Sequence, residues 1–263
     1  MTHRGLRVSA AVLAFILCGQ SLAPSAQADE TFGALINKAG RQRMLTERIV
    51  LNYVQIGLGV FPEKSRGQLA ADVALFSGQL AELQTAATTT ELVEALDNVE
   101  RQWRVFGATA TGDVSQSGAR RLLFHNDDLL FATNKVVQLL QDLSGKPFSR
   151  LVNIAGRQRM LSQRMAKFYM LREWGIDTIT TRSEMEQARN EFSGNLTALQ
   201  GDAEATEEIG AELDEVAVQW AWFENALTLI EEDTFRLVVA ESSQAILERM
   251  ERVTGLYERL ARR

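Results

Sequence analysis

The heptapeptide "AGRQRML" occurs twice in this chain, at residues 39–45 and, letter for letter, at residues 155–161. The twelve-residue segments around it, 37–48 and 153–164, differ at only three positions. The similarity continues at the same spacing, with "FSGQLAELQ" at 76–84 and "FSGNLTALQ" at 192–200. An internal repeat of this extent predicts two copies of one structural unit.

Each copy is predicted to be helical. After residue 28, proline occurs only at Pro62 and Pro147, in short loop-like segments, and the intervals between are rich in residues that favour helices. In the last segment of each copy an apolar residue also recurs at every seventh position, which is typical of helices packed in a bundle. These residues are Leu122, Leu129, Val136 and Leu143 in the first copy, and Val239, Ile246, Val253 and Leu260 in the second.

The predicted fold is all-α, with two tandem antiparallel four-helix bundles related by a pseudo-two-fold axis. The first unit, residues 29–145, has helices over 30–59, 65–86, 91–109 and 115–143. The second, residues 146–263, has helices over 148–174, 181–200, 205–231 and 233–262. Four antiparallel helices return the chain to the end where it began. The fifth helix should therefore run parallel to the first, with the two repeated phrases facing each other as in a symmetric dimer.

Residues 1–28 have the three-part form of a secretory signal peptide. Arg4 and Arg7 precede an apolar run over residues 8–18, and "SAQA" ends at Ala28, where cleavage is predicted. The apolar run is too short for a permanent membrane anchor, and we expect no membrane span elsewhere in the chain. The expected location is the periplasm.

Composition excludes several functions for the exported chain. Removing residues 1–28 changes the net charge from -6 to -8, and such an acidic chain argues against nucleic-acid binding. It also removes the single cysteine and leaves His125 as the only histidine. Without other histidines or cysteines, no common catalytic or metal-binding grouping can be assembled, and we expect no enzyme activity, metal or cofactor.

The repeated phrase has the properties of a ligand site. Gly40 and Arg43 lie on one face of a helix, as do Gly156 and Arg159. Glycine inside a helix costs about 1 kcal/mol relative to alanine, which suggests close approach of another backbone or exposure of peptide groups to a ligand. Two converging guanidinium groups need an anion between them, and their planar donors suit nitrate, nitrite or a carboxylate. The alternative is a pair of solvated faces whose arginines pair with glutamates such as Glu47.

The segments "INKAGRQRML" and "VNIAGRQRML" resemble the P-box of NarX/NarQ-type nitrate and nitrite sensor kinases. They equally resemble the start of the PilJ-type domain of type IV pilus chemotaxis transducers. The resemblance to the nitrate sensors implies a periplasmic four-helix bundle that dimerises so that two P-boxes enclose one nitrate. It also implies that Arg43 and Arg159 hold the ion, with backbone near Gly40 and Gly156 lining the site.

This chain departs from the nitrate sensors in two respects. The sensors have flanking transmembrane helices and a signalling module, neither of which we expect here, so a membrane-bound signalling partner is predicted to read the bound state. The phrase also contains an additional arginine, Arg41 or Arg157, that could favour a more highly charged anion. The full set of candidate ligand-binding residues is Arg43, Arg159, Gly40, Gly156, Arg41, Arg157, Asn37 and Asn153. The alternative function is an adaptor bundle without a small ligand, whose arginine strips dock onto an acidic helix of a type IV pilus or chemotaxis-type membrane protein.

Overall fold

The computed structural model describes residues 32–145, 147–228 and 233–261. Within these ranges the chain forms eight α-helices and no strand, which confirms the all-α prediction. The predicted signal peptide, residues 1–28, lies outside the described residues. The helices are α1 (Phe32–Leu58), α2 (Pro62–Thr85), α3 (Thr90–Ala110), α4 (Gln116–Ser144), α5 (Pro147–Glu173), α6 (Ile179–Gln200), α7 (Glu207–Thr228) and α8 (Asp233–Ala261).

Local capping explains where several helices begin. Thr89 and Ser115 accept hydrogen bonds from the backbone N–H groups of Leu92 and Gly118, three residues into α3 and α4. Helix α2 begins at Pro62, three residues before its predicted start. Proline is favoured at the first helical position, because the N–H that it lacks would have no intrahelical acceptor there.

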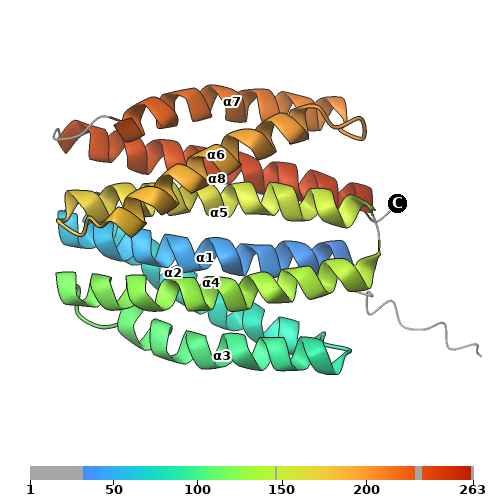
Figure 1. The fold of residues 1–263 in the computed structure, drawn as a ribbon, viewed down its shortest axis with the longest axis horizontal. Coiled ribbons are helices and arrows are strands. Elements are labelled where there is room, and N and C mark those ends of the chain that lie inside the picture. Colours follow the sequence, from blue (N-terminus) through green and yellow to red (C-terminus); the bar gives the residue numbers. More distant parts are fainter. Residues whose placement is uncertain (1–31, 146, 229–232, 262–263) are drawn as a thin grey trace, which may run out of the picture.

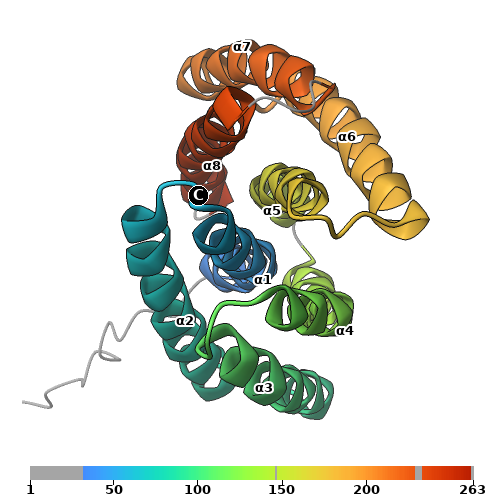
Figure 2. The ribbon, with the colours of Figure 1, turned by 90° about the vertical axis from the view of Figure 1, so that its left-hand side faces the viewer.

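Helices α1 and α5 form the centre of the molecule (Figure 2). They lie side by side, run in the same direction and make the most extensive contact of any helix pair, as the topology predicts (Figure 1). Helices α2 and α4 pack on α1, and α3 packs on α4; likewise α6 and α8 pack on α5, and α7 packs on α8. The neighbours of each helix in the first bundle thus recur in the second, consistent with the predicted two-fold relation.

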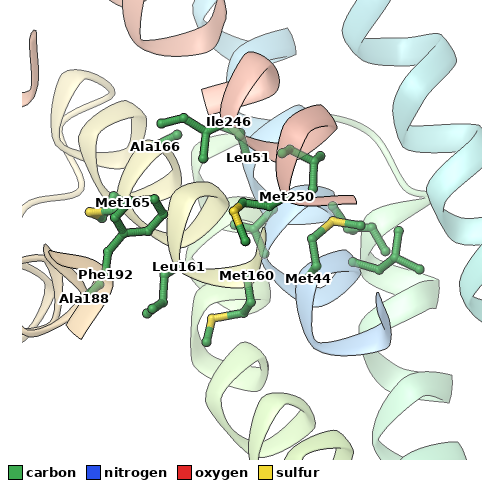
Figure 3. Close-up of a cluster of buried hydrophobic side chains, with 14 of the residues drawn as sticks. Met44, Leu51, Met160, Leu161, Met165, Ala166, Ala188, Phe192, Ile246 and Met250 are labelled. Atoms are coloured by element: carbon green, nitrogen blue, oxygen red, sulfur yellow. The ribbon is translucent and has the colours of Figure 1, made fainter. Parts of the chain in front are cut away.

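One hydrophobic core runs through both bundles. Figure 3 shows part of it, with methionines contributed by α1, α5 and α8, among them Met44, Met160 and Met250. The sevenfold apolar residues of α4 and α8 are buried as predicted, except near the helix ends, where Leu143 is exposed and Leu260 half-buried.

Aromatic pairs at matched positions pack α3 against α2 and α7 against α6. Trp103 stacks on Phe76 with ring centroids 4.0 Å apart, and Trp220 stacks on Phe192 at 4.4 Å.

In residues 32–145, 147–228 and 233–261, no helix combines the length and hydrophobicity needed to cross a membrane.

Candidate functional site

Arg43 of α1 and Arg159 of α5 meet inside the protein, where α1 packs against α5. Their side chains are among the largest that are fully buried, with 1% and 0% of their surface exposed. This contradicts the alternative in which both arginines lie on solvated faces. It also means that neither arginine can dock onto an acidic partner helix.

The two glycines of the repeated phrase make room for these guanidinium groups. A Cβ atom built on Gly40 would lie 3.5 Å from the Nη2 atoms of both Arg43 and Arg159. One built on Gly156 would lie 3.1 Å from Nη2 of Arg159 and 3.8 Å from Nη2 of Arg43. Of the two explanations for these glycines, close approach of another backbone is wrong, because the atoms nearest a Cβ at each position belong to arginine side chains. Exposure of peptide groups to a ligand stays a prediction.

Arg159 is neutralised by a carboxylate from α8. Its Nη1 donates to Oε2 of Glu251 at 2.6 Å, while its Nη2 donates to the backbone carbonyl of Asn37 at 3.3 Å. Arg41 binds the same carboxylate through Nε at 3.1 Å and Nη2 at 2.8 Å. Burial alone would raise the pKa of Glu251, but the charges and hydrogen bonds of Arg159 and Arg41 lower it to about 2.

Arg43 has only neutral partners. Its Nη1 donates to Oδ1 of Asn134 at 2.9 Å, and its Nη2 donates to Oδ1 of Asn153 at 2.7 Å and to the Asn153 backbone carbonyl at 3.4 Å. Among the described residues, no carboxylate contacts it. Burial and the positive charges of Arg157 and Arg159 lower the pKa of Arg43 to about 9, so it stays charged at neutral pH.

This difference comes from one pair of matched positions. The apolar residues that recur every seven positions align α4 with α8 at an offset of 117 residues, so that Leu122 matches Val239. The same offset matches Asn134 to Glu251. The second bundle therefore places a carboxylate where the first places a shorter, neutral amide. The Nε atoms of Arg43 and Arg159 are also buried without an acceptor among the described residues. A buried donor of this kind calls for a specific explanation.

Arg157 turns away from the centre, towards α6. It forms a two-point ion pair with Glu191, in which Nη2 donates to Oε2 at 2.9 Å and Nε donates to Oε1. Arg157 and Asn134 also line a groove of about 380 Å³ between α4, α5 and α6. The two additional arginines thus differ: Arg41 shares a carboxylate with Arg159, whereas Arg157 borders an accessible groove.

The two predicted asparagines support the arginines from both sides of the interface. Asn153 accepts from Arg43, as above, and donates through Nδ2 to Oε1 of Gln141 at 2.7 Å. Asn37 accepts from Arg159 with its backbone carbonyl and donates through Nδ2 to Oε2 of Glu258 at 2.7 Å. All eight predicted residues thus lie in or beside the contact between α1 and α5.

A second buried charged network lies one turn further along α1 and α5. The Glu47 carboxylate, 0% exposed, accepts from Nη1 of Arg164 at 2.7 Å and forms an ion pair with Nζ of Lys167 at 2.6 Å. Lys167 also donates to Oδ1 of Asn126 at 2.6 Å. Burial alone would raise the pKa of Glu47, but these two cations lower it. The network ties α1 to α5 and α4.

The repeated phrase does not itself reveal the acceptors that decide its electrostatics: Asn134, Glu251 and Glu191. All three lie outside the phrase, on α4, α8 and α6. A signal for the first two was present, because the sevenfold apolar pattern aligns Asn134 with Glu251.

The fold and the site define a protein of two fused helical bundles with a cationic cluster buried between them. Residues 26–126 and 145–247 each match the PilJ family, described as "Type IV pili methyl-accepting chemotaxis transducer N-term". These matches cover most of the chain, which therefore belongs to the PilJ family and carries the domain twice in tandem. Comparisons with curated proteins and with solved structures give no match.

Proposed function

We propose that this protein is a non-enzymatic sensory domain that binds a small oxyanion at the arginine cluster between α1 and α5. Nitrate and nitrite are the leading ligands, because the phrase resembles the P-box of the nitrate sensors. The protein would be exported to the periplasm by residues 1–28. A membrane-bound signalling protein of the chemotaxis-transducer type would read the bound state, in keeping with the family's description.

The observation that carries this proposal is the environment of Arg43. Among the described residues no carboxylate contacts this guanidinium, which is 1% exposed, and Glu191 acts on it only at longer range. A buried charge without a direct counter-ion is strongly unfavourable. Arg159 lies close enough to lower the pKa of Arg43 further, so the repulsion between the two adds to this cost. An anion would relieve both effects and could supply acceptors for the two unpaired Nε atoms.

The charges around the cluster favour an anion with a single negative charge. Arg41 and Arg157 are already paired with Glu251 and Glu191, so neither argues for the more highly charged anion that their presence first suggested. Glu258 adds a second negative charge near Arg41 and Arg159, so the remaining excess positive charge belongs to Arg43. Nitrate, nitrite and a carboxylate each carry one delocalised charge that matches a planar guanidinium.

Ligand binding would be transmitted through the contact between α1 and α5. Both arginines reach across this contact, since Arg43 bonds to the backbone of Asn153 on α5 and Arg159 to that of Asn37 on α1. An anion between the guanidinium groups would draw the helices together or shift one along the other. Such small interface movements are a known means of switching.

Thermal denaturation and calorimetric titration with nitrate and nitrite test the proposal. A bound anion should raise the melting temperature in proportion to the logarithm of its concentration. Arg43→Gln should weaken binding about ten- to a hundredfold, the effect expected for one charge-assisted hydrogen bond. Arg121→Gln, which removes an exposed arginine of α4, is the control.

No change of melting temperature with any small anion would contradict the proposal. The same result, together with co-purification of a membrane signalling protein, would favour the alternative of an adaptor bundle without a ligand. In that case the partner would contact surfaces other than Arg43 and Arg159, because both are buried.

A further inference from the structure

In the second bundle, a carboxylate of the protein itself occupies a position where an anion could bind. The Glu251 carboxylate lies between two arginines and accepts from Nε and Nη2 of Arg41 and from Nη1 of Arg159. One carboxylate is thus held at this position by the second arginine of one copy of the repeated phrase, Arg159, and the first arginine of the other copy, Arg41.

The matched position in the first bundle has the same cations but lacks the carboxylate. Asn134 stands in the place of Glu251, Arg43 in the place of Arg159, and Arg157 in the place of Arg41. The asparagine side chain is one methylene shorter than glutamate and carries no charge. Its Oδ1 accepts from Arg43, and its amide nitrogen has no acceptor among the described residues. The volume of about one methylene and one negative charge are therefore missing at Asn134, which borders an open groove.

Solvent reaches this position through the groove between α4, α5 and α6. Asn134 and Arg157 line the groove, and its volume of about 380 Å³ lies within the range of small-molecule sites. The matched region between α8, α1 and α2 holds a pocket of about 20 Å³, which is lined by neither Arg41 nor Glu251. The opening beside Asn134 is therefore much larger than this pocket in the matched region.

The lining of the groove indicates the rest of the ligand. Five of its residues are apolar and form a surface beside the two polar groups: Leu130, Phe131, Met160, Leu161 and Ala188. A triatomic or tetraatomic ion would leave most of this space unfilled. The remaining border carries Gln187, the carboxylates Asp127, Glu184 and Glu191, and Arg164. Because Arg164 is already paired with Asp127 and Glu184, a second anionic group on the ligand would meet an excess of carboxylates.

We infer that this groove binds an organic monocarboxylate with a short apolar tail, whose carboxylate contacts Asn134 and Arg157 beside Arg43. The ligand carboxylate supplies to the first bundle what Glu251 supplies to the second, and the tail covers the apolar wall formed by α4, α5 and α6. This inference rests on the proposed function, since it requires that an anion bind at the arginine cluster. It adds where the ligand binds, its chemical class, and that each chain has one such site.

A series of acids tests the inference on the unmodified protein. Acetate, butyrate, benzoate, succinate and nitrate are titrated by calorimetry and by thermal shift. Each buried methylene should tighten binding about fourfold, so butyrate, with two more methylenes, should bind roughly fifteenfold tighter than acetate. Benzoate should also exceed acetate, whereas succinate should bind more weakly than butyrate. One ligand should bind per chain.

Two variants locate the site. Asn134→Glu supplies the missing carboxylate from the protein itself, so it should raise the melting temperature without ligand and abolish butyrate binding. Gln187→Trp fills the groove without changing its charge and should remove the preference for butyrate over acetate. Ala71→Trp is the matched control, because residue 71 occupies the equivalent exposed position on α2 and should leave the preference unchanged.

The outcomes separate this inference from the proposed function. If nitrate binds but butyrate binds no tighter than acetate, the groove is not the ligand site and only the broader proposal survives. Unchanged butyrate binding in Asn134→Glu or in Gln187→Trp would overturn the inference in the same way. If no anion changes the melting temperature of the unmodified protein, both proposals fail together.

Discussion

At the scale of single residues, Arg43 and Arg159 occupy matched positions yet should contribute unequally to stability. Replacing Arg43 with glutamine removes a buried charge that no carboxylate offsets, so the lost hydrogen bonds are balanced by relief of desolvation. We expect a change in unfolding free energy within about 1 kcal/mol. Arg159→Gln breaks a charge-assisted bond to Glu251 and should destabilise by about 1.5–3 kcal/mol. Urea denaturation without added anion measures both, and equal losses would show that Arg43 has a partner equivalent to Glu251.

Glu251 should make stability depend on pH in the acidic range. Its pKa falls from an ordinary 4.5 to about 2 in the folded protein, chiefly because the positive charges of Arg159 and Arg41 outweigh the effect of burial. A depressed carboxyl pKa stabilises the fold above pH 4.5, and this contribution is lost as the pH falls towards 2. It amounts to about 3 kcal/mol at neutral pH.

The difference in unfolding free energy between the unmodified protein and Glu251→Gln isolates this contribution from other acidic groups. That difference should be largest at neutral pH and should shrink steadily between pH 4.5 and pH 2. The comparison requires urea titrations at several pH values. A difference that stays constant from pH 6 to pH 3 would mean that Glu251 has an ordinary pKa.

At the scale of helices, the sequence predicted which segments are helical but not how charged faces meet across helices. Sevenfold spacing and capping residues are local signals, so seven of the eight predicted starts lie within two residues of the observed ones. The start of α2 was misplaced because Pro62 begins the helix rather than preceding it. The partner of Arg157 is Glu191 on α6, where the repeat has Leu75 on α2. Such a non-local pairing cannot be read from the phrase itself.

The buried Glu47–Lys167 ion pair should link α1 to α5, and removing only one of its two charges should strongly destabilise the fold. Glu47→Gln leaves Lys167 buried without its carboxylate and should destabilise by about 3–5 kcal/mol. The chain itself offers the compensating change, since Gln163 and Leu51 occupy the positions matched to Glu47 and Lys167. Glu47→Gln combined with Lys167→Leu should therefore recover most of that loss.

A double-mutant cycle measured by urea denaturation gives the coupling between these two residues. Additive effects of the two substitutions would contradict the link. Arg164 serves as an internal reference, because it retains Glu184 at 3.0 Å after Glu47 is neutralised. Its own replacement by glutamine should therefore destabilise by less than Glu47→Gln.

At the scale of the whole molecule, the even number of antiparallel helices in each bundle and the short linker between the bundles determine the architecture. Four antiparallel helices followed by a short connection place α5 beside α1 in parallel, which the sequence was enough to predict. Divergence between the repeats has since made the two sides of this contact unequal. Glu47 of the first bundle faces Lys167 of the second, and only the second supplies a carboxylate to its own central arginine. These differences escape any analysis that treats the repeats as equivalent copies.

The unequal charges should make the two halves prefer each other to copies of themselves. A pair of first halves would bury two Glu47 carboxylates without Lys167, and two Arg43 guanidinium groups without Glu251. A pair of second halves would bury two Lys167 ammonium groups opposite Gln163, the neutral residue matched to Glu47. Buried unpaired charges are costly enough to select partners. Residues 29–145 and 146–263, produced together as separate chains, should therefore form mainly a one-to-one complex in native mass spectrometry. Glu47→Gln with Lys167→Leu should reduce this preference, and a mixture of homodimers from the unmodified halves would show that these charges do not direct the pairing.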